Sequence, residues 1–201
     1  MRRFKTNKGM LIEEHVFGAE SPRSFYDNFS KFYTFIPRYC SPDAHGHRDM
    51  KSWLKEFLSP KMYEELDEAF EECGATKDNL LKLIEYAKKR GFVLFPVNKT
   101  GDDYVLLDEV TGSGFVGVIF MSKEDIYKIW SKRISPALLE KIKEDLREQV
   151  RDYSCWANDE VFSYYFEGEK DDFIESFGAI DDYPHIKDSL GVTEFSQYLV
   201  D

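Results

Sequence analysis

The residue types best suited to chemistry gather in one short stretch, RYCSPDAHGHRDMK, at residues 38–51. Its candidate catalytic side chains are Asp43, His45, His47 and Asp49, and Cys40 is a further possible metal ligand. Such side chains bind metal ions or transfer protons. A zinc site usually draws a second ligand pair from elsewhere in the chain, but the other histidines, His15 and His185, are isolated. We therefore favour a polar loop that leads into a helix, and we expect no metal and no cofactor.

The same stretch imitates a magnesium-dependent nuclease motif. Pro42-Asp43…Asp49-Met50-Lys51 has the order Pro-Asp…Asp/Glu-x-Lys, in which two acids hold magnesium beside a lysine. In nucleases of that fold the two acids lie on neighbouring strands. The residues between Asp43 and Asp49, AHGHR, are too few for that arrangement, and the segment that follows looks helical. An enzyme that acts on a nucleotide or nucleic acid, centred on this loop, is kept as an alternative hypothesis.

A glycine-rich segment, TGSGFVG at 111–117, is the nearest approach to a phosphate-binding loop. It joins two expected strands and does not open a helix, so it lacks the helix N-terminus that favours phosphate binding. We predict a hairpin turn there.

Helices are expected where apolar residues recur every three or four positions. The expected helices span 47–58, 60–73, 78–90, 123–130 and 137–153. Start signals precede them: Ser59, Thr76 and Ser122 are expected N-caps, and Ser135-Pro136 opens the last helix. The last helix carries one apolar stripe, made of Leu138, Leu139, Ile142, Leu146 and Val150.

Strands are expected where short aromatic and β-branched runs alternate with turn residues. The runs at 92–97, 103–109 and 115–121 predict an antiparallel meander, and Pro96 indicates an edge position for the first of them. Runs at 160–167 and 172–178 flank the turn GEKD and predict a hairpin, followed by one short helix and a last strand.

Residues 1–46 are expected to be irregular, with one short strand at MLIEEHVFG. Helices, meander, helix and hairpin in that order indicate an α+β fold. We predict a single domain over 1–201. A sub-division near residues 90 and 91 would leave 1–90 mainly helical and 91–201 α+β.

The charge of the chain is unevenly placed. The net charge is −11, and residues 152–201 alone hold 13 acidic side chains against two lysines. Residues 1–151 balance, with 25 basic and 25 acidic side chains. The acidic quarter is also rich in Tyr and Phe, so it is expected to fold and to present carboxylates. The carboxylates expected to bind a partner are Asp159, Glu160, Glu167, Glu169, Asp171, Asp172, Glu175, Asp181 and Asp182.

The setting suggested by the sequence is the cytoplasm. Three cysteines without a C-x-x-C spacing suit reduced thiols better than a disulfide framework. No stretch reaches the ~18 apolar residues of a membrane span.

Five short segments of the sequence occur in a characteristic order. They are SPRSFYDN (21–28), RYCSPDAH (38–45), GSGFVGVIFMSKEDIYK (112–128), EQVRDY (148–153) and NDEVFSYYFEGE (158–169). In this order they resemble a family of small phage- and prophage-encoded proteins with PR-x-x-DN, RY…D-x-H, a DSGQVG-type turn and S-K-E. The chain departs from that pattern by one extra residue between Arg23 and Asp27 and by VTGSGFVG in the turn. The resemblance implies a mobile-element setting and an α+β domain, but no activity.

Three functions follow as hypotheses. The first is an inhibitor of a host nucleic-acid-handling defence complex, of the anti-CRISPR or anti-restriction kind, that mimics nucleic acid. Its partner would be a nucleic-acid-binding protein or ribonucleoprotein with a basic groove, and the chain itself would bind neither DNA nor a membrane. The second is the enzyme centred on residues 38–51. The third is a structural or regulatory phage protein, with a homodimer formed through the edge strand at 92–97.

Overall fold

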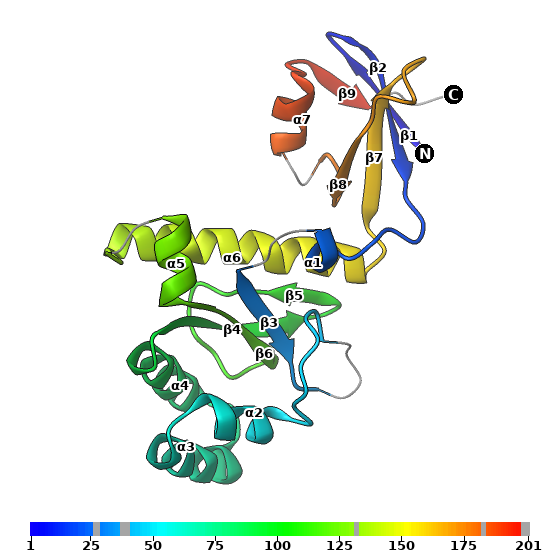
Figure 1. Cartoon of the computed structure of the whole chain (residues 1–201). Helices are drawn as coiled ribbons and strands as arrows, with labels where there is room; N and C mark the ends of the chain where they lie inside the picture. Colours follow the sequence, from blue (N-terminus) through cyan, green and yellow to red (C-terminus); the bar gives the residue numbers. More distant parts are fainter. Residues whose placement is uncertain (26–28, 37–40, 131–132, 182–183, 198–201) are drawn as a thin grey trace. The chain divides into compact units, whose positions relative to one another are not determined.

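The computed structural model describes residues 1–25, 29–36, 41–130, 133–181 and 184–197, and Figure 1 shows their course. The chain forms two compact units. Unit 1 comprises Met1–Ser24 with Asp152–Asp201, and unit 2 comprises Phe25–Arg151. Helices and two antiparallel sheets confirm the predicted α+β class. The boundaries of the units lie at 24/25 and 151/152, whereas residues 90 and 91 lie inside unit 2.

The sheet of unit 2 has the order β3-β6-β4-β5. Its strands are β3 (Ser30–Thr34), β4 (Phe92–Thr100), β5 (Asp103–Val105) and β6 (Phe115–Ser122). The predicted antiparallel pairing is correct, but the meander order is wrong, because β6 pairs with β4 and not with β5. The cause is the burial of β6 from Val116 to Met121, which suits a strand with neighbours on both sides. β5 has only three residues and lies at the edge.

The helices of unit 2 are α2 (Met50–Phe57), α3 (Pro60–Cys73), α4 (Lys77–Lys89), α5 (Lys123–Ile129) and α6 (Pro136–Ala157), whose last residues, 152–157, belong to unit 1. All but α2 begin within one residue of their expected starts. α2 begins three residues later than expected, with Asp49 as its N-cap, and Ser59 precedes α3 without a side-chain cap bond. The side chain of Thr76 accepts a hydrogen bond from the backbone N–H of Asn79, and Ser122 does the same for Asp125. These bonds satisfy backbone donors that the first helical turn leaves without partners.

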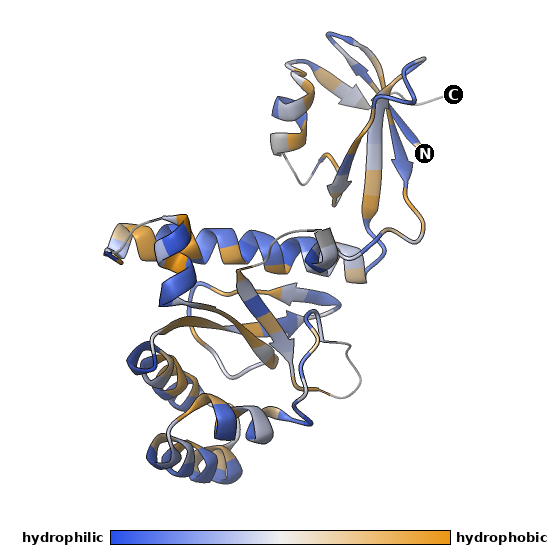
Figure 2. Cartoon of the chain, viewed as in Figure 1, coloured by the Kyte–Doolittle hydropathy of each residue, from blue (hydrophilic) through white to orange (hydrophobic). Residues whose placement is uncertain are grey.

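Both faces of this sheet are covered. Val118 and Phe120 pack with Trp53 and Leu80 on the side of α2, α3 and α4. Figure 1 shows α6 crossing the opposite side of the sheet, and Figure 2 shows how apolar and polar residues alternate along the helices. On α6 the predicted stripe is confirmed at Ile142, Leu146 and Val150, which are buried. It fails at Leu139, which is 37% exposed.

Unit 1 is a sheet with the order β8-β7-β2-β1-β9. Its elements are β1 (Arg2–Thr6), β2 (Gly9–His15), β7 (Val161–Phe166), β8 (Ile174–Phe177), α7 (Pro184–Leu190) and β9 (Phe195–Gln197), and α1 (Pro22–Phe25) lies at its boundary with unit 2. The predicted hairpin, short helix and last strand of the C-terminal region are confirmed. The short strand expected at MLIEEHVFG is confirmed as β2. The expectation that the rest of 1–46 is irregular is wrong, because β1 and β2 form a hairpin between β7 and β9 and β3 follows.

The core of unit 1 lies on one face of its sheet. Phe4, Leu11, Tyr164, Ile180 and Ile186 are all buried there. They come from both ends of the chain, so the N-terminal hairpin finds its apolar partners about 150 residues away along the sequence. Among the helices of the described residues, none is long and apolar enough to cross a membrane.

Candidate functional site

Asp43, the first of the candidate catalytic residues, is held against the edge of the sheet of unit 2. Its backbone N–H donates to the carbonyl of Phe32 at 3.0 Å. Its carboxylate oxygen Oδ2 accepts from the N–H of Phe32 at 2.7 Å. Since β3 is the outer strand on this side, these bonds satisfy edge groups that would otherwise face water. The carboxylate of Asp43 thus binds a backbone N–H group of the edge strand.

The two histidines of the stretch lie beside Tyr33 of β3. The ring centroid of His45 is 4.7 Å from that of Tyr33, and the rings of His45 and His47 stack at 5.6 Å. His45 Nε2 also lies 3.3 Å from the carbonyl oxygen of Thr34, and His47 Nδ1 lies 3.8 Å from Glu56. The two rings therefore extend an aromatic layer along the sheet edge.

Asp49 serves as the N-cap of α2. Its side chain accepts from the backbone N–H of Ser52 at 2.8 Å, and this bond, with a second from the Ser52 side chain, lowers the pKa of Asp49. The structure thus brings His45 and His47 together beside Tyr33. Asp43 binds the backbone of Phe32, and Asp49 caps α2. Within the described ranges, no three His, Cys, Asp or Glu side chains gather as metal ligands, and Cys40 lies outside those ranges.

The glycine-rich segment 111–117 is explained by close backbone packing. A Cβ atom on Gly112 would lie 1.7 Å from the carbonyl oxygen of Ala75, and one on Gly117 would lie 2.0 Å from that of Tyr33. The predicted hairpin turn is wrong, because β5 and β6 are not neighbours in the sheet. The segment instead lies at the end of the connection between β5 and β6, which places β6 on the side of β4 opposite to β5.

The carboxylates predicted to bind a partner are exposed wherever the structure describes them. Asp159 and Glu160 precede β7, Glu175 is on β8, and Asp181 follows it. The turn between β7 and β8 carries Glu167, Glu169, Asp171 and Asp172. Asp182 lies outside the described residues.

Three of these carboxylates are engaged within unit 1. Asp181 accepts from Arg2 at 2.9 Å, Glu167 lies 3.8 Å from Arg3, and Asp159 lies 3.7 Å from His15. In the part of the chain that the structure describes, the remaining carboxylates of the hairpin form no ion pair. We call this set the acidic turn; it consists of Glu169, Asp171, Asp172 and Glu175.

The lysine of the turn points back to the sheet. Lys170 Nζ lies 3.0 Å from Glu14 and 5.6 Å from the ring centroid of Tyr165. This contact, chiefly through its hydrogen bond, raises the pKa of Lys170 and lowers that of Glu14. Lys170 is thus paired with Glu14 and with none of the four carboxylates of the acidic turn.

Two apolar side chains lie between Asp172 and Glu175 of the acidic turn. Phe173 is 51% exposed and Ile174 is 37% exposed. The backbone N–H of Asp172 donates to the carbonyl of Glu169 at 3.0 Å, and that of Glu169 donates to Phe166 at 2.9 Å, so the turn has a defined path. An exposed aromatic ring among unpaired carboxylates is a suitable anchor for a cationic partner.

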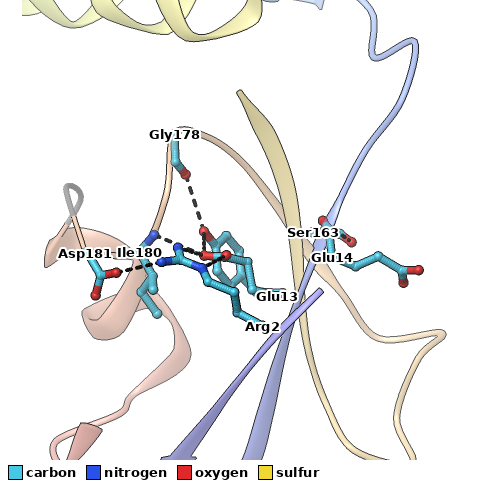
Figure 3. Close-up of polar contacts among 8 residues, drawn as sticks. Arg2, Glu13, Glu14, Ser163, Gly178, Ile180 and Asp181 are labelled. Carbon is cyan, nitrogen blue, oxygen red and sulfur yellow. Dashed lines mark hydrogen bonds and ion pairs between the residues drawn. The ribbon is translucent and has the colours of Figure 1, made fainter. Parts of the chain in front are cut away.

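A buried polar network that the sequence pattern does not reveal joins β1, β2, β7 and the segment after β8, and Figure 3 shows it. Glu13 is 2% exposed, and its carboxylate accepts two hydrogen bonds from the guanidinium of Arg2, one of them 2.6 Å long. The hydroxyl of Tyr164 donates to the same carboxylate at 2.9 Å. Hydrogen bonding to Glu13 raises the pKa of Arg2, and burial followed by the charge of Glu13 raises that of Tyr164.

The network connects three parts of unit 1 that are distant in sequence. Arg2 joins Glu13 on β2 to Asp181 on the segment after β8, and Tyr164 contributes from β7. The burial of Glu13 is indicated by its position two residues after Leu11, because this spacing puts both side chains on the same face of a strand. That signal depends on knowing that residues 9–15 form a strand.

Comparison of the chain with family models, with curated proteins and with solved structures finds no match in any of the three.

Proposed function

We propose that the chain is a binding protein that presents the acidic turn and neighbouring carboxylates of unit 1 to the basic groove of a nucleic-acid-binding partner. The observation that carries the proposal is the group of exposed carboxylates without ion pairs at Glu169, Asp171, Asp172 and Glu175. Nucleic-acid-binding proteins present Lys and Arg to phosphates, so a group of exposed carboxylates can compete for the same groups.

The charge of the two units supports this assignment. Unit 1 has 7 basic and 16 acidic side chains, a net charge of −9. Unit 2 has 20 basic and 22 acidic side chains, a net charge of −2. A field of this sign attracts a cationic groove and repels DNA. The contacts of Asp43, His45 and Asp49 favour a binding protein over an enzyme centred on 38–51.

We propose counter-defence in a bacterial host as the setting, of the anti-CRISPR or anti-restriction kind, with the chain in the cytoplasm. The support for this setting is the ordered series of phage-like words in the sequence. The proposed partner is therefore a host nuclease or ribonucleoprotein complex that binds nucleic acid in a basic groove.

The test is capture from a bacterial lysate followed by competition with DNA. The wild-type chain should retain a nucleic-acid-binding protein, and a DNA oligonucleotide should displace it. The triple charge reversal Glu169→Lys, Asp171→Lys and Asp172→Lys should abolish capture. The matched control is Glu64→Lys, Glu68→Lys and Glu72→Lys, which reverses three exposed charges on α3 in unit 2.

Two results would contradict the proposal. One is a captured partner that binds the chain and the oligonucleotide together with unchanged affinities. The other is capture that survives reversal of the acidic turn as well as it survives reversal on α3. Circular dichroism of each variant shows whether it is folded before the comparison is made.

A further inference from the structure

Unit 2 contains a cavity of about 560 Å³ beside the first half of β4. Residues of α4, β4, α5 and the start of α6 line it: Ile84, Lys88, Phe92, Val93, Leu94, Phe95, Lys123, Tyr127, Arg133, Ile134, Ser135, Pro136 and Leu139. The walls are mostly apolar. Pockets for small molecules typically have volumes of about 300–1,000 Å³, so this cavity is large enough to hold one.

The cavity lies beside a stretch of β4 that has a strand on one side only. β5 pairs with β4 only from Asn98 to Thr100. In the described residues, the preceding stretch of β4, 92–97, therefore has β6 on one side and no strand on the other. Pro96 lies in this stretch, as the sequence predicts for an edge position, and its missing N–H costs no ladder bond on the open side.

Two large side chains at the cavity are exposed to solvent. Tyr127 is 40% exposed and Leu139 is 37% exposed. Leu139 belongs to the apolar stripe of α6 but, unlike Ile142 and Leu146, it is not buried. Exposed apolar groups around a concave site are a common mark of ligand binding.

The charged residues at the cavity are all cationic. They are Lys88, Lys123 and Arg133, and no Asp or Glu is among the described lining residues. Neither Lys88 nor Lys123 forms an ion pair with any described carboxylate, and Lys123 Nζ lies 3.4 Å from the carbonyl oxygen of Lys88. In a chain with a net charge of −11, Lys88 and Lys123 beside an apolar cavity mark a local preference for anions.

We propose that this cavity binds a small organic anion with a flat apolar body. The apolar part lies against Phe95, Ile84 and Leu139, and a phosphate or carboxylate group lies at Lys88 and Lys123. The proposal is independent of the acidic turn, which belongs to unit 1 and has the opposite charge.

The test uses the full chain and the fluorescent probe 1-anilinonaphthalene-8-sulfonate, an aromatic anion whose emission rises in an apolar site. We expect about one probe to bind per chain. The double substitution Lys88→Gln with Lys123→Gln should weaken binding roughly three- to tenfold, the effect of two partly exposed charge contacts. The control is Lys55→Gln with Lys141→Gln, two exposed lysines outside the cavity, and should leave affinity unchanged.

A second variant tests the position of the apolar part. Leu139→Glu puts a carboxylate at the cavity and should weaken probe binding more than the lysine substitutions do. Leu81→Glu is the matched control, because Leu81 is an exposed leucine of α4, 43% exposed, that does not line the cavity. Both positions are partly exposed, so neither variant is expected to unfold the chain.

Competition with the probe separates the two head groups. 1-Naphthyl phosphate and 1-naphthoate should both displace it, and the tighter one identifies the preferred head group, whereas neutral 1-naphthol should compete weakly. Three outcomes would overturn the proposal: equal competition by naphthol, probe binding that both lysine pairs affect alike, or probe binding that Leu139→Glu does not reduce. Displacement by an extended peptide but by neither naphthyl anion would also overturn it, in favour of strand addition at β4.

Discussion

The hydroxyl of Tyr164 donates a hydrogen bond of 2.9 Å to the carboxylate of Glu13, which is only 2% exposed. The two residues face one another across the antiparallel pair of β2 and β7. A buried carboxylate is tolerated when charged and polar donors surround it, and here Arg2 and Tyr164 supply them. The two ends of the chain are therefore joined by a polar contact as well as by the sheet.

Removing the carboxylate should destabilise unit 1 strongly. We expect Glu13→Ala to cost about 3–5 kcal/mol, because Arg2 and Tyr164 both lose their buried acceptor. Tyr164→Phe should cost less, about 1–3 kcal/mol, since Arg2 still neutralises Glu13. Urea titration followed by circular dichroism measures both values. Equal costs for the two variants, or a cost for Glu13→Ala within that of an exposed control such as Glu20→Ala, would contradict this account.

Tyr164 should also make the fold sensitive to alkali. Burial, and then the negative charge of Glu13, raise the pKa of Tyr164 above its ordinary value of 10.0. Above about pH 10 the unfolded chain releases this proton while the folded chain keeps it, so the free energy of unfolding must fall as pH rises. Urea titrations at about pH 8 and about pH 11 should show a smaller loss in Tyr164→Phe than in wild type. An identical loss in both proteins would show that Tyr164 does not contribute.

The core of unit 2 depends on Trp53. Its side chain is 2% exposed, and its ring stacks on Phe57 with centroids 4.5 Å apart. Trp53→Ala should therefore cost about 3–5 kcal/mol of stability. Phe57 is only partly buried, so Phe57→Ala should cost less than Trp53→Ala in the same denaturant titration. A larger cost at Phe57 would contradict the burial of this helix face.

The glycines of the segment 111–117 should tolerate no side chain. Gly117→Ala places a methyl group against the carbonyl of Tyr33 in the neighbouring strand, and backbone atoms cannot rotate away. We expect a loss of about 1–3 kcal/mol, the usual cost of overpacking, or more if β3 separates from β6. Gly46→Ala is the control, because its added Cβ would have no heavy atom within 4 Å. Thermal denaturation measures both, and equal midpoints would contradict the steric reason for Gly117.

Local signals in the sequence predict most helices and strands correctly, but they do not predict which strands pair with one another. The caps at Thr76 and Ser122 act within one turn of helix, so their effect is visible in a short window of sequence. The pairing of β6 with β4 and of β2 with β7 depends on contacts between distant segments. The N-terminal hairpin was missed for the same reason, because its apolar residues Phe4 and Leu11 are covered by the C-terminal quarter.

The same limit applies to the candidate site. Composition shows that residues 152–201 are acidic, and the hairpin that carries the acidic turn follows from local alternation. It does not show that Lys170 pairs with Glu14 or that Asp181 pairs with Arg2, because those partners come from the N-terminal hairpin. Nor does it show that the carboxylate of Asp43 accepts a hydrogen bond from the backbone of Phe32, because that contact joins the loop to a strand edge.

The two kinds of residue in the acidic turn should affect binding in different ways. Charge acts over distance and mainly steers encounter, so Asp171→Asn with Asp172→Asn should lower the association rate constant for the captured partner. That effect should shrink as salt rises, because exposed charges are screened over about 8 Å at physiological ionic strength. Phe173→Ser removes a short-range apolar anchor and should raise the dissociation rate constant at every salt concentration.

Surface plasmon resonance of the captured partner at several salt concentrations separates these two effects. Phe17→Ser is the matched control, since Phe17 is 83% exposed and lies in unit 1 outside the acidic turn. If Phe173→Ser and Phe17→Ser change the dissociation rate equally, the ring of Phe173 is not an anchor. If the asparagine substitutions leave the association rate unchanged at low salt, the carboxylates of the acidic turn do not steer a cationic partner, because a long-range field cannot lose two of its charges without slowing encounter.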